Sequence, residues 1–224
     1  MRRKRLKRKF KIGLAVLFVL FLSGLIPVIR YGDVNLTESV VGFSSRTEAK
    51  GILGGEATVY SDSRFIETYG NWPYYILFLG FLLYGFFGRK NPGKKKYLRV
   101  SLIYLLVQLV ASGIITQGLK YAVGRPRPSQ ARSEGHLRKP FHTSMRYRSF
   151  PSGHSADAFS SAGVLWMFSS SPEVMGLSFA YSCMVALSRV TADRHFFLDI
   201  LAGTVIGFSV ALILMYKKYE EDGG

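Results

Sequence analysis

The sequence predicts an all-α polytopic membrane protein, a single domain (residues 1–224) folded as a bundle of six transmembrane helices. The chain is 48% hydrophobic yet carries a formal net charge of +16. The charged residues cluster, while the apolar residues lie in runs of about 20, the length that crosses a bilayer. A basic soluble nucleic-acid-binding fold is the alternative, but runs of this kind are costly to expose to water, so no nucleic-acid partner is expected.

The first predicted span, Phe10–Ile29, follows a basic tail. Residues 1–11 contain eight Lys or Arg and form the expected cytoplasmic tail. This pattern is also found in signal peptides, but the apolar core is too long and no small-residue cleavage site follows it. We therefore expect an uncleaved transmembrane helix.

Five more spans complete the predicted bundle. An aromatic cluster typical of headgroup depth opens the second span, and prolines separate the third span from the fourth. The fifth has only about fourteen residues, so a buried or re-entrant helix is its alternative. These spans are Trp72–Phe87, Val100–Leu119, Ser155–Ser169, Val174–Leu187 and Phe196–Tyr216.

Charge distribution predicts the orientation of the bundle. Six crossings place both termini on one side, together with the six basic residues of segment 89–99, and the positive-inside rule makes that side cytoplasmic. Segments 30–71 and 120–150 are then extracytoplasmic. In the first, residues 61–69 are a candidate interfacial helix without evident chemistry. The second carries eight basic residues and one acidic residue between 120 and 148, which breaks the rule. Either the topology differs from this prediction or these cations are retained for an anionic ligand.

Three polar clusters lie at span ends on the predicted outer side. They are Lys120 with Arg127-Pro128, Pro151-Ser152-Gly153-His154, and Ser188-Arg189 with His195 and Asp199. The guanidinium forks of Arg127 and Arg189 match phosphate oxygens, and Lys120 adds a point charge. Ser152 and Gly153 precede a helix, where backbone N–H groups attract anions. The clusters together predict a phosphate-binding site.

The third cluster also predicts a nucleophile. His195 and Asp199 are four residues apart, which on a helix places them on one face and lets the carboxylate hold one ring nitrogen. The other nitrogen is then free to attack phosphorus. His154, arriving from another helix, is the candidate proton donor to the leaving group.

The pattern Lys-x6-Arg-Pro, Pro-Ser-Gly-His and Ser-Arg-x5-His-x3-Asp resembles the type-2 phosphatidic acid phosphatase superfamily, which also includes bacterial acid phosphatases and vanadium haloperoxidases. The resemblance covers about 25 residues and is matched at every defining position. It implies a six-helix membrane bundle and a phosphomonoesterase that uses a phosphohistidine and needs neither a metal nor another cofactor. It implies the same roles for His195, His154 and Asp199, and phosphate binding by Lys120, Arg127, Ser152, Gly153 and Arg189.

We therefore expect a lipid phosphatase of a bacterial inner membrane, with cytoplasmic termini and an extracytoplasmic site that a lipid reaches from the bilayer. Undecaprenyl diphosphate, phosphatidylglycerophosphate, phosphatidic acid and lipid A phosphate are the candidate substrates by resemblance. A lipid phosphotransferase, a non-catalytic lipid-binding or transport protein and a haloperoxidase are the alternatives. The pattern Cys-x5-Arg at Cys183 and Arg189 matches cysteine phosphatases but lacks their glycine-rich loop.

Overall fold

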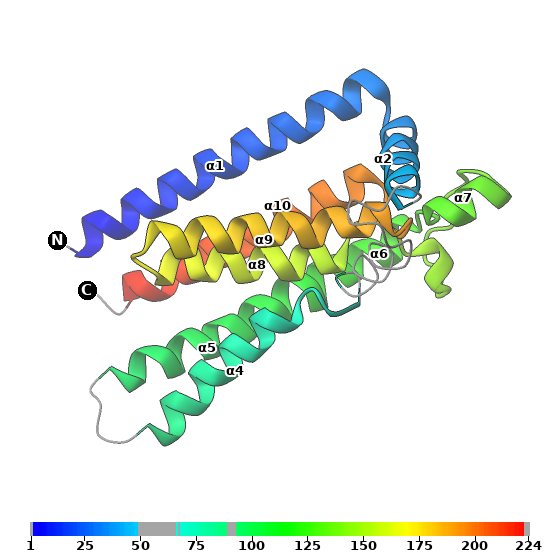
Figure 1. The fold of residues 1–224 in the computed structure, drawn as a ribbon. Helices are drawn as coiled ribbons and strands as arrows, with labels where there is room; N and C mark the ends of the chain where they lie inside the picture. Colours follow the sequence, from blue (N-terminus) through cyan, green and yellow to red (C-terminus); the bar gives the residue numbers. More distant parts are fainter. Residues whose placement is uncertain (1, 49–65, 67, 89–92, 222–224) are drawn as a thin grey trace.

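A computed structural model describes residues 2–48, 66, 68–88 and 93–221, and within them it contains helices and no strand. The long helices run roughly side by side in one elongated bundle, while α2 and α7 lie at one end of it (Figure 1). Their bounds are α1 Arg2–Tyr31, α2 Asp33–Glu48, α4 Trp72–Phe87, α5 Lys94–Gln108, α6 Gln117–Val123, α7 Pro128–Glu134, α8 Gly153–Phe168, α9 Pro172–Thr191 and α10 Phe197–Glu221. A π-helical stretch, η1 Leu109–Thr116, joins α5 to α6, and a 3-10 turn, η2 Met145–Tyr147, precedes α8.

Each predicted span overlaps a helix, except that Val100–Leu119 runs through α5, η1 and α6, and α4 has the predicted bounds. The weakest prediction, Val174–Leu187, is a 20-residue helix, because Ser171 caps its start through a hydrogen bond from Val174 N–H and Pro172 fits its first turn. The candidate interfacial helix at 61–69 lies mostly outside the described residues.

Four helices of the described part of the chain are long and apolar enough to cross a membrane: Lys4–Arg30, Lys94–Glu134, Pro172–Thr191 and Phe197–Tyr219. Helix α4 is apolar but shorter. The six-crossing count therefore stays a prediction. The distribution of buried side chains is also typical of a membrane protein. Large apolar side chains such as those of Phe18 and Leu177 are exposed, whereas the hydroxyl side chains of Ser160 and Ser182 are buried.

Helix α8 lies at the centre, and α10 packs closely along it. A Cβ atom on Gly203 would lie 2.3 Å from the Ser152 carbonyl oxygen, and one on Gly207 would lie 2.2 Å from that of Ala156. Glycine at these positions lets the two backbones meet, as in membrane helix pairs generally. The contact with Gly203 is made at the start of α8, so this packing fixes the position of the Pro-Ser-Gly-His motif.

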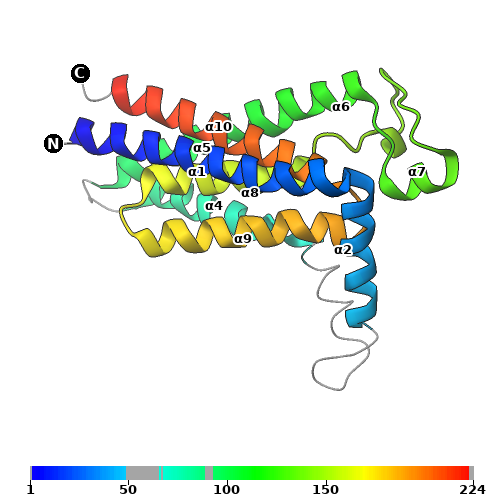
Figure 2. The same cartoon turned by 90° about the horizontal axis from the view of Figure 1, so that it is seen from above.

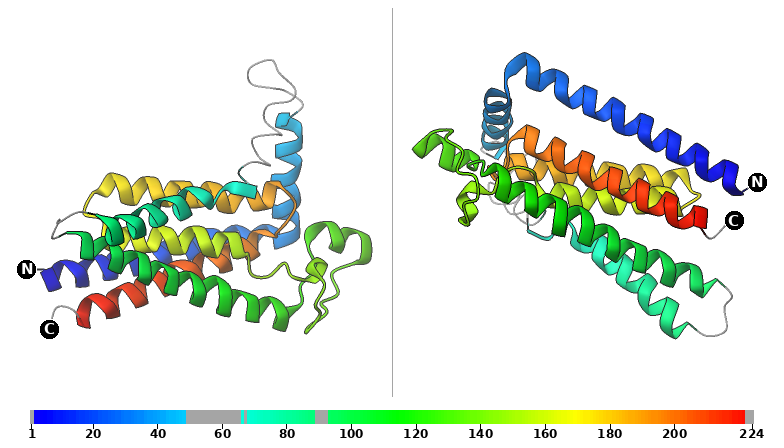
Figure 3. Two further views of the ribbon diagram at one scale, coloured as in Figure 1. Left: turned by 90° about the horizontal axis from the view of Figure 1, so that it is seen from below. Right: turned by 180° about the vertical axis from the view of Figure 1, so that it is seen from behind.

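The two ends of the bundle differ in what they hold. Both termini and the start of α5 lie at one end, as Figures 1 and 2 show. We call this the basic end, because it carries the cationic residues 2–9 and 94–96. At the opposite end, α2 turns away from the direction of α1 and lies across the bundle, and α7 projects beyond it (Figure 3). All three predicted motifs reach this second end, which we call the site end.

Candidate active site

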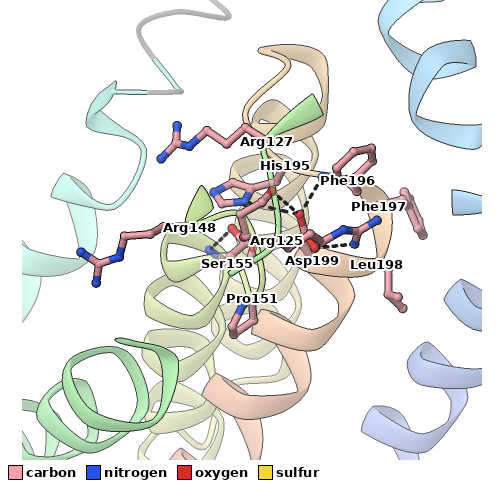
Figure 4. Close-up of polar contacts among 12 residues, drawn as sticks. Arg125, Arg127, Arg148, Pro151, Ser155, His195, Phe196, Phe197, Leu198 and Asp199 are labelled. Atoms are coloured by element: carbon pink, nitrogen blue, oxygen red, sulfur yellow. Dashed lines mark hydrogen bonds and ion pairs between the residues drawn. The ribbon is translucent and has the colours of Figure 1, made fainter. Parts of the chain in front are cut away.

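The three motifs meet at the site end from five elements. Lys120 lies on α6, Arg127 precedes α7, the Pro-Ser-Gly-His motif begins α8, Arg189 ends α9, and Asp199 lies on the first turn of α10. His195 lies in the turn between α9 and α10. In Figure 4 the guanidinium groups of Arg127 and Arg148 lie to one side of His195, and Asp199 lies to the other. The predicted convergence is therefore observed.

His195 is buried, and its ring is held through one nitrogen. Its Nδ1 lies 2.8 Å from the backbone oxygen of Ser149. A carbonyl only accepts, so Nδ1 carries the proton and Nε2 keeps its lone pair. Burial lowers the pKa of His195 to about 4, so the ring is neutral at neutral pH. This is the state that a nucleophile requires.

Asp199 supports His195 less directly than the spacing predicts. Its Oδ2 lies 3.8 Å from Nδ1, beyond hydrogen-bond distance, because α10 begins after His195 and the pair does not share a helical face. The fully buried carboxylate instead accepts bonds from Ser149 Oγ at 2.5 Å, Phe196 N–H at 3.0 Å and Arg125 Nη1 at 2.7 Å. Asp199 thus binds the residue that follows His195 and also Ser149, whose backbone oxygen binds the imidazole.

Lys120 is 7% exposed, and its side chain contacts the loop that precedes α8. Its Nζ donates to the Pro151 oxygen at 2.5 Å and to the Arg148 oxygen at 2.9 Å. An ammonium has three donors, so one remains for a phosphate oxygen. A Cβ atom on Gly153 would lie 3.9 Å from Lys120 Cε, so this side chain lies beside the start of α8.

The start of α8 departs from the prediction at Ser152. Its N–H donates to the Asp199 backbone oxygen at 2.9 Å, so this donor is not directed at a ligand as expected. Its Oγ accepts from Ser155 N–H and caps the helix. Gly153 and His154 follow as the first helical residues, whose N–H groups have no acceptor within the helix. Phosphate binding by Ser152 and Gly153 stays a prediction, with the N–H groups of Gly153 and His154 as the candidate donors.

The remaining predicted residues complete the wall of the site. Arg189 is 6% exposed, and its backbone oxygen accepts from the N–H groups of Arg194 and His195. Arg127 is half-buried, and its Nε donates to the Met145 oxygen at 3.2 Å. Burial lowers the pKa of His154 to about 3, and the charges of Arg189 and His195 act in the same direction. Among the described residues, no three His, Cys, Asp or Glu side chains are grouped to hold a metal ion.

Three supporting residues were not expected from the sequence. Ser149 binds both His195 and Asp199, as described above. Arg125 binds Asp199 and also Asp33 of α2, at 2.5 Å, and lies 4.0 Å over the ring of Phe196. Arg125 stands inside the first motif stretch, which is the only sequence signal for it. Asp33 gave no signal, because it is 92 residues from its partner.

A comparison of the sequence with known families covers the same motifs. The profile of the PAP2 superfamily matches residues 101–222, which include every motif residue. The chain belongs to the PAP2 superfamily. The predicted family is thereby confirmed, and the matched segment begins within α5 and ends at the close of α10.

Individual relatives of this PAP2 chain carry lipid phosphatase names. A lipid A 1-phosphatase of Rhizobium etli is 30% identical over 190 residues, which is 82% of this chain and 78% of that protein. A probable diacylglycerol pyrophosphate phosphatase 1 of Schizosaccharomyces pombe is 29% identical over 64% of this chain and 62% of its own length. The crystal structure of Aquifex aeolicus LpxE superposes with a TM-score of 0.50 at 26% identity, over 68% of this chain and 84% of that chain.

Proposed function

We propose that this PAP2 chain is an integral membrane lipid phosphatase in which His195 forms a phosphohistidine. The observation that carries the proposal is the state of His195. Its Nδ1 is committed to a carbonyl, its Nε2 is left with a lone pair, and Lys120, Arg127 and Arg189 lie at the same end of the bundle as this ring. A neutral nucleophile among phosphate-binding cations is suited to phosphoryl transfer.

The reaction proceeds in two displacements. Nε2 attacks phosphorus while the bond to the lipid oxygen breaks, and His154 gives its proton to that oxygen. Water then attacks the phosphohistidine, His154 takes a proton from the water, and the bond between Nε2 and phosphorus breaks as phosphate is released. The bound phosphate favours the protonated ring of His154 at the start, since an opposite charge stabilises the cation.

A lipid substrate is supported by an apolar cavity beside the site. The cavity has a volume of about 240 Å³ and lies between α1, α8, α9 and α10. Its wall includes Leu20, Cys183, Phe197 and Ile200, and the last two are close to Asp199 in the chain. We infer that an acyl chain occupies this cavity, next to the start of α10. Lipid A phosphate is the first substrate to test, because a relative covering 82% of this chain is named a lipid A 1-phosphatase.

We further propose a bacterial inner membrane with the basic end in the cytoplasm. The clustering of residues 2–9 and 94–96 at the end opposite the site supports this orientation. A reporter enzyme fused near Gly135, on the site end, should respond as an extracytoplasmic fusion. A cytoplasmic response there would reverse the proposed topology.

The decisive experiment is a phosphate-release assay of the purified protein on lipid A phosphate, undecaprenyl diphosphate, phosphatidylglycerophosphate and phosphatidic acid. We expect release from at least one lipid, inhibition by vanadate and activity in the presence of chelators. Phosphate released should equal lipid consumed, and a shortfall would indicate transfer to another acceptor. His195→Ala should abolish turnover, and a fully active variant would refute the phosphohistidine.

A further inference from the structure

The backbone directly after His195 is held by side chains rather than by its own helix. Phe196, Phe197 and Leu198 are three consecutive residues whose N–H groups point out of the start of α10. Such groups have no acceptor within their helix. Here Phe196 N–H donates to Asp199 Oδ2, but the other two donate to residues far away in the sequence.

Those two acceptors belong to the first turns of α2. Phe197 N–H donates to Thr37 Oγ1 at 3.1 Å, and Leu198 N–H donates to Asp33 Oδ1 at 2.8 Å. We call Asp33 and Thr37 the α2 cap. Thr37 is 1% exposed, so water does not readily replace its hydroxyl as the acceptor for Phe197 N–H. A cap of this kind normally comes from the residue preceding the helix. In this protein it comes from another helix, which lies across the site end.

Arg125 ties the α2 cap to the motif carboxylate. One nitrogen of its guanidinium binds Asp33 Oδ2 at 2.5 Å, and the other binds Asp199 Oδ1 at 2.7 Å. The side chains of Arg125 and Asp33 are 13% and 12% exposed, and that of Asp199 is not exposed. Pairs this sheltered hold their geometry better than surface pairs, which are screened by water. Asp33 therefore reaches the turn of His195 by two routes, through Leu198 N–H and through Arg125.

We propose that Asp33 and Thr37 of α2 are positioning residues for His195. They touch neither the substrate nor the reacting atoms, and they act by fixing the turn that carries the imidazole. The inference rests on the proposed role of His195 as nucleophile. Segment 30–71, which has no motif, thereby gains a part in the reaction.

The test separates positioning from folding by measuring phosphohistidine formation per folded molecule in a single turnover. Asp33→Ala removes both routes and should slow this step about 10- to 100-fold, as expected when a reacting group is displaced by about 1 Å. KM should change less than about threefold, because the phosphate-binding cations are untouched. Asp33→Asn keeps an acceptor for Leu198 N–H and loses the ion pair with Arg125, so its loss should be intermediate.

Two substitutions of Thr37 form a matched pair of variants, and a substitution of another residue on α2 is the control. Thr37→Val removes the acceptor for Phe197 N–H and should slow the step, whereas Thr37→Ser keeps the hydroxyl and should restore it. Glu38→Gln changes an exposed charge on the same helix and should leave the rate at the wild-type value. If Asp33→Ala does not fold, Asp33→Asn and the Thr37 pair decide.

The outcomes distinguish this inference from the proposed function. A wild-type protein that releases phosphate from none of the four lipids refutes the proposed function. An active wild type with Asp33→Ala, Asp33→Asn and Thr37→Val all within about twofold of it per folded molecule refutes the positioning role alone. The positioning role is also refuted if the variants only reduce the amount of folded protein.

Discussion

The two ends of α8 are each held by a lysine, and the two lysines differ in the groups that surround them. At the basic end, Lys9 of α1 donates to the Trp166 oxygen at 3.1 Å and to the Ser169 oxygen. At the site end, Lys120 of α6 donates to the oxygens of Pro151 and Arg148. Both side chains thus use an ammonium to bind backbone carbonyls beside the same helix.

Their surroundings differ. The neighbours of Lys9 along the chain, Lys7 and Arg8, are exposed to solvent. Lys120 is buried, and so are Arg189 and Asp199 near it. Removing charges from water is costly, and several charges buried together indicate a site kept for a ligand or a reaction. The number of cations at each end gives no such indication, because the basic end is rich in them too.

The largest expected effect at the site end comes from Asp199→Asn. The amide cannot accept bonds from Arg125, Ser149 and Phe196 as a carboxylate does, so the turn of His195 loses its fixed position. We expect the rate of phosphohistidine formation to fall by about 10³- to 10⁴-fold, as for other carboxylates that orient a histidine. Rapid-quench measurement of the phosphoenzyme tests this. A loss below about tenfold would mean that the Ser149 carbonyl alone orients the ring.

The fold was largely predictable because apolar runs and charge clusters are local signals. The helix α8 shows the limit of such signals, since its 16 residues include small and hydroxyl side chains suited to a central position. It does not reach the length and hydropathy of a membrane span although it is the most enclosed helix. A helix needs high hydropathy where its side chains contact lipid, and a helix at the centre of the bundle makes few such contacts.

The sequence predicts the motif residues of the candidate site but not the residues that support them. Lys120, His154, His195 and Asp199 stand in spacings that predict phosphate chemistry. The pairing of Asp33 with Arg125 depends on how α2 lies across the bundle, which no local pattern encodes. The backbone also altered two details, since Ser152 N–H binds Asp199 and the Ser149 carbonyl binds the imidazole.

Lys120→Met should produce the next largest effect. It removes a cation from the phosphate site and leaves the carbonyls of Pro151 and Arg148 without their donor. We expect kcat/KM to fall about 10²-fold, comparable to the loss of one preorganised donor to a developing negative charge. Lys120→Arg should not restore the rate, because the planar guanidinium does not fit the position of an ammonium. Full activity of Lys120→Met would make this lysine equivalent to Lys9.

The pH dependence tests whether burial sets the state of His195. The neutral ring is the nucleophile, and its pKa is lowered to about 4 by burial, with Lys120 and Arg189 acting in the same direction and Asp199 opposing them. Phosphohistidine formation in single turnovers should therefore hold as pH falls through 6.5, the ordinary value for histidine. It should drop about tenfold per pH unit only below about 4. A midpoint near 6.5 would show that water reaches the ring.

Lys9→Met should give the smallest effect on the reaction and completes the comparison. Losing the two hydrogen bonds to the end of α8 should lower the free energy of unfolding by about 1 kcal/mol. Turnover per folded molecule should stay within about twofold of wild type, since the bonds lie at the end of α8 opposite His154. Lys7→Met, an exposed neighbour on α1, is the matched control and should change neither quantity. If Lys9→Met slows phosphohistidine formation as much as Lys120→Met does, α8 transmits strain along its whole length and the two ends are not separate in function.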